Sequence, residues 1–263
     1  GFLTCVSAFA LLAVAVGGCR AKRCIPCDEA GSADGHAAHA DGQSEKKEYY
    51  ALPGLDHGLL QSPVNGLSEE TTPGQHSIVC HGGGEAKEVL NRGSTVQLSI
   101  GRGNTTDFDG KTYEFKQLHF HTPSEHLIDG ITYPMEMHLV HARQGAAADA
   151  PPSYLAISLL IRMGKPNRFL AEFLDAIPEE PGKSAKLHDV FLGHVFPPGL
   201  DLERIHYYHY KGSLTTPPYT ESVDWLIAKE IIEAAPEQIQ RINILEGDNA
   251  RHVQALYSRA VDQ

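Results

Sequence analysis

From about Tyr49 onward, short hydrophobic runs alternate with clusters of Gly, Pro and Asn. Alternating or β-branched runs of this length predict strands, and the clusters between them predict turns. Two stretches predict short helices, 168–176 and 236–245, the second with Pro236 in its first turn. The clearest strand patterns are 94–100, 112–120, 136–141 and 155–161. The chain is therefore predicted to fold as a mainly β (α+β) domain over residues 49–263.

The first 48 residues have a different pattern. Residues 1–18 carry no charge and are mostly apolar, too short to span a bilayer but typical of a secretory signal. Val16-Gly17-Gly18-Cys19 resembles the lipobox of bacterial lipoproteins, which implies cleavage before Cys19 and lipidation of that residue; a plain signal cut nearby is the alternative. Gly1 stands without Met or a basic region, so we expect the natural start to lie upstream. Residues 19–48, polar and rich in Ala and Gly, predict a disordered tether.

Composition restricts the class of function. The 263-residue chain has a formal net charge of −11, which disfavours binding to phosphate backbones and hence to nucleic acid. Five cysteines include Cys24 and Cys27 in a lone CxxC, for which a local disulfide or two idle thiols is the expected state. These observations favour a secreted protein acting on a small molecule.

Candidate metal chemistry lies in two of the predicted strands. In 117–121, Gln117, His119 and His121 share one strand face, with the apolar residues on the other. In 136–140, Glu136 and His138 share a face. Asp129-Gly130 between the runs is a hairpin signal, so antiparallel pairing would bring His138 to the other two histidines.

Three imidazoles with an open fourth position are typical of catalytic zinc, whereas structural zinc has four protein ligands and is often Cys-rich. Gln117 and Glu136 are placed to hold the outer ring nitrogens of the histidines. A lone HxH would more simply be histidines packed in a β-core. The third histidine, with Glu two residues before it, favours the metal site.

The chain is similar to the α-class carbonic anhydrases. The similarity covers about residues 58–261 and rests on Gln-Ser-Pro-Val-Asn at 61–65, on 117–126 and 136–141, on Gly-Ser-Leu-Thr-Thr-Pro-Pro at 212–218, and on Asn-Ala-Arg at 249–251. It implies a central twisted, mostly antiparallel sheet with short peripheral helices. It also implies Zn²⁺ on His119, His121 and His138, and reversible hydration of CO₂ to bicarbonate and a proton by a zinc-bound hydroxide.

The resemblance assigns further residues. Thr215 would donate its hydroxyl to the Glu125 carboxylate and thereby orient the attacking oxygen. An apolar wall for CO₂ and a substrate-contacting threonine would come from Val140, Ile157, Leu214, Thr216, Val223 and Trp225.

Three departures from the family stand out. Ser94 occupies the position of the proton-shuttle histidine, and serine cannot relay a proton near neutral pH as imidazole does. His57, Tyr49 or Tyr50 are possible replacements. The N-terminal segment before residue 61 is short and lacks a His-Trp pair. Tyr219 stands where many bacterial members have a disulfide cysteine, and the upstream cysteine is also absent.

Two other functions share parts of this pattern. A catalytically weak carbonic-anhydrase-like domain, used for binding or zinc buffering at the cell surface, is the main alternative. A copper–zinc superoxide dismutase also uses HxH on a β-scaffold but needs a second, bridged metal. The expected location is the bacterial cell envelope, with the domain in the periplasm or at the cell surface and a lipid anchor at Cys19.

Overall fold

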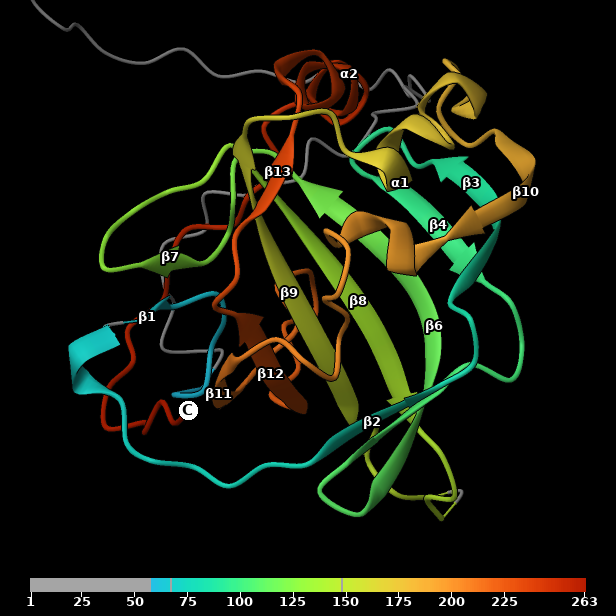
Figure 1. Ribbon diagram of the computed structural model, residues 1–263. Coiled ribbons are helices and arrows are strands. Elements are labelled where there is room, and N and C mark those ends of the chain that lie inside the picture. The colour runs from blue at the N-terminus through green and yellow to red at the C-terminus, as the bar shows by residue number, and fades with distance from the viewer. Residues whose placement is uncertain (1–57, 67, 148) are drawn as a thin grey trace, which may run out of the picture. The chain divides into compact units, whose positions relative to one another are not determined.

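The computed structural model describes residues 58–66, 68–147 and 149–263 (Figure 1). The predicted signal segment, Cys19, the tether and His57 lie outside the described residues. Among the residues that are described, no helix has the length and apolar character needed to cross a membrane.

Thirteen strands and a few short helices make up the described fold. The strands are β1 Asn65–Gly66, β2 Ile78–His81, β3 Glu85–Asn91, β4 Val96–Ile100, β5 Thr105–Phe108, β6 Lys111–His121, β7 Leu127–Ile128, β8 Met135–Arg143, β9 Tyr154–Met163, β10 Ser184–Phe191, β11 Tyr207–Gly212, β12 Val223–Ala228 and β13 Ile232–Ala234. The α-helices are α1 Arg168–Ala171 and α2 Pro236–Glu246, with 3₁₀ turns η2 Ser68–Glu70, η3 Leu174–Ala176 and η4 Leu192–Val195.

One large sheet dominates the structure. Its main path runs β10-β3-β4-β6-β8-β9-β12-β11, with β5 paired to β6, β2 to β5, and β13 to β9. Every pair is antiparallel except β12 and β13 against β9, which are parallel. Figure 1 shows β6, β8 and β9 side by side in the middle of the sheet. The prediction of a mainly β, mostly antiparallel fold is confirmed.

One of the two predicted helices is present as expected, and the other is broken into two short pieces. The second is confirmed as α2, which begins at Pro236 and ends before Gly247, whose φ of +67° takes the backbone out of the helix. The first, expected over 168–176, is instead one short helix, α1, followed by the 3₁₀ turn η3. The backbone leaves helical geometry at Phe173, where φ is −133°. Because Phe169 and Phe173 are both buried, the break is compatible with continuous packing of this segment against the core.

A β-bulge in β6 decides which side chains face which way. The register of β6 against β8 shifts between Phe115 and Gln117. Before the bulge Tyr113 and Phe115 are in the main hydrophobic core, and after it Leu118 and Phe120 are. The extra residue reverses the odd–even alternation. Odd-numbered positions from 117 to 121 therefore leave the main core and face the opposite side of the sheet.

That opposite side carries a second, smaller hydrophobic cluster. It contains buried residues of β9, β11 and β12, namely Ala156, Leu160, Tyr208, Tyr210, Val223, Trp225 and Ile227, together with Val64 and Val261. The polar side chains that matter for function lie on this face, between the central strands and the loops that cover them.

Candidate metal centre

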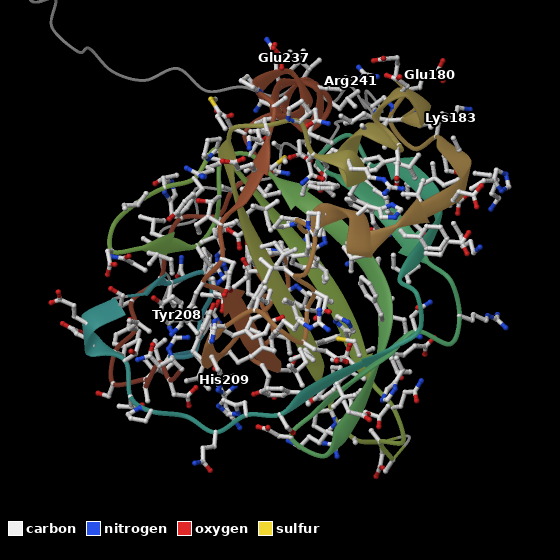
Figure 2. The ribbon with its side chains drawn as sticks, in the orientation of Figure 1. Glu180, Lys183, Tyr208, His209, Glu237 and Arg241 are labelled. Carbon is white, nitrogen blue, oxygen red and sulfur yellow. The ribbon has the colours of Figure 1, made fainter. Side chains whose placement is uncertain are left out.

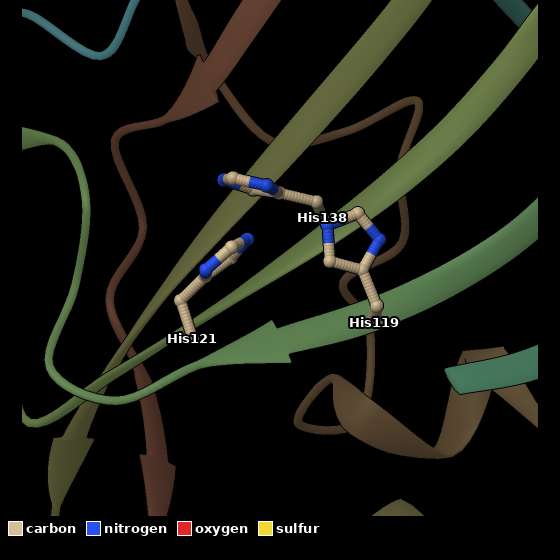
Figure 3. Close-up of side chains that lie close together, drawn as sticks. All are labelled: His119, His121 and His138. Carbon is tan, nitrogen blue, oxygen red and sulfur yellow. The ribbon is translucent and has the colours of Figure 1, made fainter. Parts of the chain in front are cut away.

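Three histidines converge on the central strands. His119 and His121 come from β6 and His138 from β8, and His119 is directly paired with His138 in the register. Their ring centroids are 4.6–5.2 Å apart. One nitrogen from each ring lies within 4.8 Å of the others. Figure 3 shows the three rings turned toward a common space. The structure thus brings together the three residues expected from the sequence.

The protonation of these rings suits metal binding. His121 and His138 are almost completely buried, and neither nitrogen of His121 has a hydrogen-bond partner. Burial lowers the pKa of both rings, and the neighbouring histidines lower the pKa of His121 further. Neutral imidazole is the form that coordinates a metal. The buried, neutral rings of His121 and His138, together with His119, therefore fit a cation such as Zn²⁺ in the space that the three rings share.

Two side chains hold the outer nitrogens of the trio. Gln117 Oε1 lies 3.0 Å from His119 Nδ1, and Glu136 Oε1 lies 2.6 Å from His138 Nε2. These contacts leave Nε2 of His119 and Nδ1 of His138 available for a metal. The structure has both contacts expected for Gln117 and Glu136, and each contact fixes the ring orientation and tautomer.

Glu136 is the centre of a larger buried network. Its Oε1 accepts from the Ser158 hydroxyl at 2.6 Å and lies 2.7 Å from His126 Nδ1. Its Oε2 accepts from the backbone N–H groups of Glu125 and His126 at 2.7 and 2.8 Å. Burial alone raises the pKa of this carboxyl, but attraction and hydrogen bonds from His126 and His138 outweigh burial and place the pKa well below its usual value. Glu136 is therefore ionised although it is fully buried.

His126 and Ser158 were not assigned roles from the sequence. His126 lies directly after Glu125, and its Nε2 is 2.7 Å from the Tyr210 hydroxyl, which extends the network to β11. Ser158 is the only polar residue in the apolar run 155–161. That polarity was a usable signal, because a buried polar side chain needs a polar partner.

Glu125 lies beside the trio. Its Oε1 is 3.5 Å from His121 Nδ1 and accepts from the backbone N–H of Arg251 at 2.9 Å. Burial and the nearby charge of Glu136 raise the pKa of Glu125 to about 8, while interaction with the Thr215 hydroxyl acts in the opposite direction. A divalent cation among the imidazoles would lower this pKa again by attraction. Arg251 thus helps to hold the Glu125 carboxylate beside the histidines, a role that the sequence did not reveal because it showed Arg251 only as part of a motif.

Several of the expected apolar positions face the same space. The Trp225 ring is 4.8 Å from that of His138, and Trp225 Nε1 donates to the Ser213 carbonyl at 3.0 Å. Val140 is paired with Gln117 in the register and so lies on the ligand face. Val223 is buried in the second cluster, and Leu214 packs against it. Thr216 is half-buried in the turn that follows Thr215.

The expectation for Ile157 is wrong. In the register of β8 and β9, Ile157 is paired with Leu139 and His138 with Ser158. Ile157 therefore belongs to the main core on the far side of the sheet. The residue on the ligand face is Ala156, which is paired with Val140 on one side and with Trp225 on the other.

Ser94 lies in the turn between β3 and β4. Arg92 N–H donates to the Thr95 carbonyl at 3.0 Å, and Gly93 has φ of +75°. The Asn249 amide donates to the carbonyls of Ser94 and Phe120, at 2.9 and 3.1 Å. This amide ties the turn to the end of β6, next to His121.

Comparisons with known proteins agree with this geometry. The sequence profile described as eukaryotic-type carbonic anhydrase matches residues 45–263, which include all three histidines. A carbonic anhydrase of Neisseria gonorrhoeae is 36% identical over 206 residues, covering 78% of this chain and 77% of that protein. The solved structure of the α-carbonic anhydrase from Thermovibrio ammonificans, in complex with the inhibitor sulfanilamide, has a TM-score of 0.68 and 33% identity over 78% of this chain and 88% of that one. The Photobacterium profundum α-carbonic anhydrase has a TM-score of 0.69 and 32% identity, over 78% and 90% of the two chains.

Proposed function

This chain belongs to the eukaryotic-type (α) carbonic anhydrase family and is a carbonic anhydrase, and on that premise we propose that it hydrates CO₂ with a zinc ion held by His119, His121 and His138. The observation that carries the proposal is the convergence of the three imidazoles, two of them buried, with the outer nitrogens of His119 and His138 held by Gln117 and Glu136. A zinc ion bound there supplies Lewis acidity that lowers the pKa of water to about 7, a value established for carbonic anhydrases as a class.

Thr215 and Glu125 orient the nucleophile in this proposal. An ionised carboxylate only accepts hydrogen bonds, so the Thr215 hydroxyl donates to Glu125 and its oxygen remains free to accept. Thr215 Oγ1 then accepts from the attacking oxygen and directs its lone pair at the carbon of CO₂. The N–H of Arg251 on Glu125 Oε1 supports the ionised state that this role requires.

The wall for CO₂ is formed by Val140, Ala156, Leu214, Val223 and Trp225. CO₂ is apolar, so an apolar surface beside the metal concentrates and positions it. We assign Thr216 to contact with bound substrate or bicarbonate, as the family resemblance implies. Ala156 replaces Ile157 in this set because the strand register puts it on the ligand face.

Each hydration releases a proton that must leave the site. The position at which the family resemblance places a proton-shuttle histidine carries no histidine here. Ser94 stands there, and its hydroxyl does not take up and release a proton near neutral pH as an imidazole does. We propose that transfer of the proton to buffer limits turnover when buffer is weak.

We further propose that the protein is exported to the cell envelope and anchored through lipid on Cys19. The support is the uncharged apolar segment 1–18 and the small residues before Cys19. Several acyl chains hold a protein on a membrane stably, where one does not. Labelling of cells with a fatty-acid analogue should mark the wild-type protein and leave a Cys19→Ala variant unlabelled.

A CO₂ hydration assay on zinc-loaded protein tests the proposed function. We expect activity that is lost on chelation, returns with Zn²⁺, and is absent from His119→Ala together with the bound zinc. His188→Ala, at an exposed position on β10, is the matched control and should keep both zinc and activity. Negligible activity of the zinc-loaded wild type would instead favour the binding or zinc-buffering alternative.

A further inference from the structure

A second group of metal-ligating side chains lies outside the three-histidine centre. It consists of His76, before β2, His209 on β11, and Asp262 near the end of the sequence. The rings of His76 and His209 meet edge to face with centroids 4.3 Å apart. Figure 2 labels His209 at the lower part of the molecule. None of these residues belongs to the proposed zinc centre.

The polar atoms of this group have a regular arrangement. Asp262 Oδ1 lies 3.1 Å from His76 Nε2 and 3.0 Å from His209 Nδ1. The other nitrogen of each ring faces a separate carboxylate: His76 Nδ1 is 2.6 Å from Asp109, and His209 Nε2 is 3.2 Å from Asp224. Each histidine thus has one nitrogen directed inward to a shared carboxylate and one directed outward to its own.

We propose that His76 Nε2, His209 Nδ1 and Asp262 form a second site for a divalent transition-metal ion of the zinc class. Ligating histidines in proteins almost always donate their other N–H to a carboxylate, carbonyl or water, which fixes the tautomer and strengthens the ligand. Asp109 and Asp224 occupy those outer positions here. Two imidazoles and a carboxylate suit zinc, nickel or copper rather than calcium or magnesium.

Two of the three donor separations are close to those of a tetrahedral shell, and the third lies within 4.8 Å. Bonds of about 2.0–2.1 Å to zinc place tetrahedral ligand atoms about 3.3 Å apart. The two measured separations from Asp262 Oδ1, 3.0 and 3.1 Å, need to open by only a few tenths of an ångström. Water would complete the shell.

Backbone hydrogen bonds hold two of the three ligands, His209 and Asp262, in place. His209 and Asp262 exchange N–H to carbonyl bonds of 2.9 and 3.0 Å. On the other side, Thr72 donates to the Val261 carbonyl and accepts from the Gln263 N–H, both at 3.0 Å. Because the chain around Asp262 is fixed between two segments, little ordering remains for a metal to impose.

Charge and access also favour a cation. Three carboxylates, those of Asp109, Asp224 and Asp262, surround two imidazoles. A surface cavity of about 280 Å³ is lined by both histidines and provides an approach from solvent. Lys229 lines the same cavity, but its ammonium lies over the Tyr208 ring, 4.5 Å from the centroid, and contacts Gln263.

Zinc counting on the full-length, catalytically loaded enzyme tests this proposal. Wild type, equilibrated with Zn²⁺ and desalted, should hold one more zinc per chain than His76→Gln, and calorimetric titration should show the same difference. CO₂ hydration should be equal in the two proteins. His206→Gln is the matched control, because the exposed His206 pairs with a single carboxylate, that of Glu230, and its loss should leave the extra zinc in place.

Asp109→Asn changes the partner of the outer nitrogen of His76 and leaves all three ligand residues in place, while the amide oxygen of Asn can still accept from the Ser77 N–H. The variant should keep the fold, and its affinity for the extra zinc should be about 10–100-fold weaker.

Two results would overturn the proposal: equal zinc content in wild type and His76→Gln, or no zinc in wild type beyond that lost with His119→Ala. In the second case the cluster is a network of histidines and carboxylates that holds no metal. If His76→Gln does not fold, unchanged zinc affinity in Asp109→Asn would overturn the proposal in the same way.

Discussion

His119 and His138 lie directly opposite each other on neighbouring antiparallel strands, with ring planes at 89° and centroids 5.2 Å apart. The pairing of β6 with β8 sets the two residues opposite each other, and the contacts of Gln117 and Glu136 orient the rings, so the strands act as the frame of the metal centre. His121 joins from the next position on the same face of β6. Changes that leave the register intact should therefore alter the chemistry of the site without dispersing its ligands.

Gln117→Ala should weaken zinc binding about 10–100-fold, because His119 Nδ1 loses the amide oxygen at 3.0 Å that fixes its orientation. Zinc affinity measured by competition with a chelator checks this. Gln240→Ala, at an exposed position on α2, is the control and should bind zinc as wild type does. Equal affinities of the Gln117→Ala variant and wild type would show that the contact does not support the metal.

Thr215→Val should lower kcat/KM on the order of 10²-fold while zinc content stays at one per chain in the catalytic site, because the nucleophile loses its orienting acceptor. Stopped-flow CO₂ hydration, with metal analysis of the same samples, provides the measurement. Thr220→Val changes an exposed side chain nearby and is the control, and it should have the kcat/KM of the wild type. An unchanged kcat/KM in Thr215→Val would remove Thr215 from the mechanism.

Imidazole should raise kcat in weak buffer, by up to ~10²-fold, because Ser94 cannot relay the proton that each hydration releases. Ser94→His should raise kcat in weak buffer and reduce the response to imidazole. A kcat of the wild type that ignores imidazole concentration would mean that another group already exports the proton.

Ala156→Leu should reduce kcat/KM by more than about tenfold, because the added bulk enters the apolar wall between Val140 and Trp225. Ile157→Val should leave kcat/KM unchanged and cost about 0.5–1.5 kcal/mol of unfolding free energy, as a core truncation does. Kinetics and urea unfolding of both variants separate the two faces of β9. The reverse pattern would restore Ile157 to the substrate wall.

Glu246 should make stability fall as pH rises above about 4.3. Burial raises the pKa of this carboxyl well above its usual value, although Val96 N–H and the Thr122 hydroxyl donate to it at 3.1 Å. The folded state then binds a proton that the unfolded state has released, so unfolding becomes easier between the two pKa values. Glu246→Gln, which cannot ionise, should lack this component. Urea unfolding of both proteins from pH 4 to 8 measures it, and parallel pH profiles would contradict it.

Tyr219, where the resemblance led us to expect a disulfide cysteine, is held by non-covalent contacts in the structure. The Arg251 guanidinium lies over the Tyr219 ring, 3.8 Å from the centroid, and Gln61 Nε2 donates to the Tyr219 carbonyl at 3.2 Å. Gln61 Oε1 in turn accepts from Arg251 at 3.0 Å. The segment around Gln61 is thus joined to the turn after Pro218 without a covalent bond.

Local sequence patterns were enough to predict the class of fold and the first two metal ligands, His119 and His121. The alternation of Gln117, His119 and His121 with Leu118 and Phe120 is local information, and so is the helix-starting Pro236. The third ligand, His138, followed from the expectation that the two strands pair across a turn. These features depend on residues close together in the chain, where side-chain direction is set by the period of the strand.

The remaining features depend on long-range strand pairing, which is visible only in the folded chain. Residues 155–161 are apolar on both faces apart from Ser158, so the run does not show which face meets the metal, and Ile157 was assigned to the wrong one. The register of β8 against β9 places Ala156 there instead. Likewise, His76, His209 and Asp262 are separated by up to 186 positions and meet only because the chain around Asp262 pairs with both β11 and the segment before β2. Contacts at such separations follow from how strands pair, and no local pattern encodes that pairing.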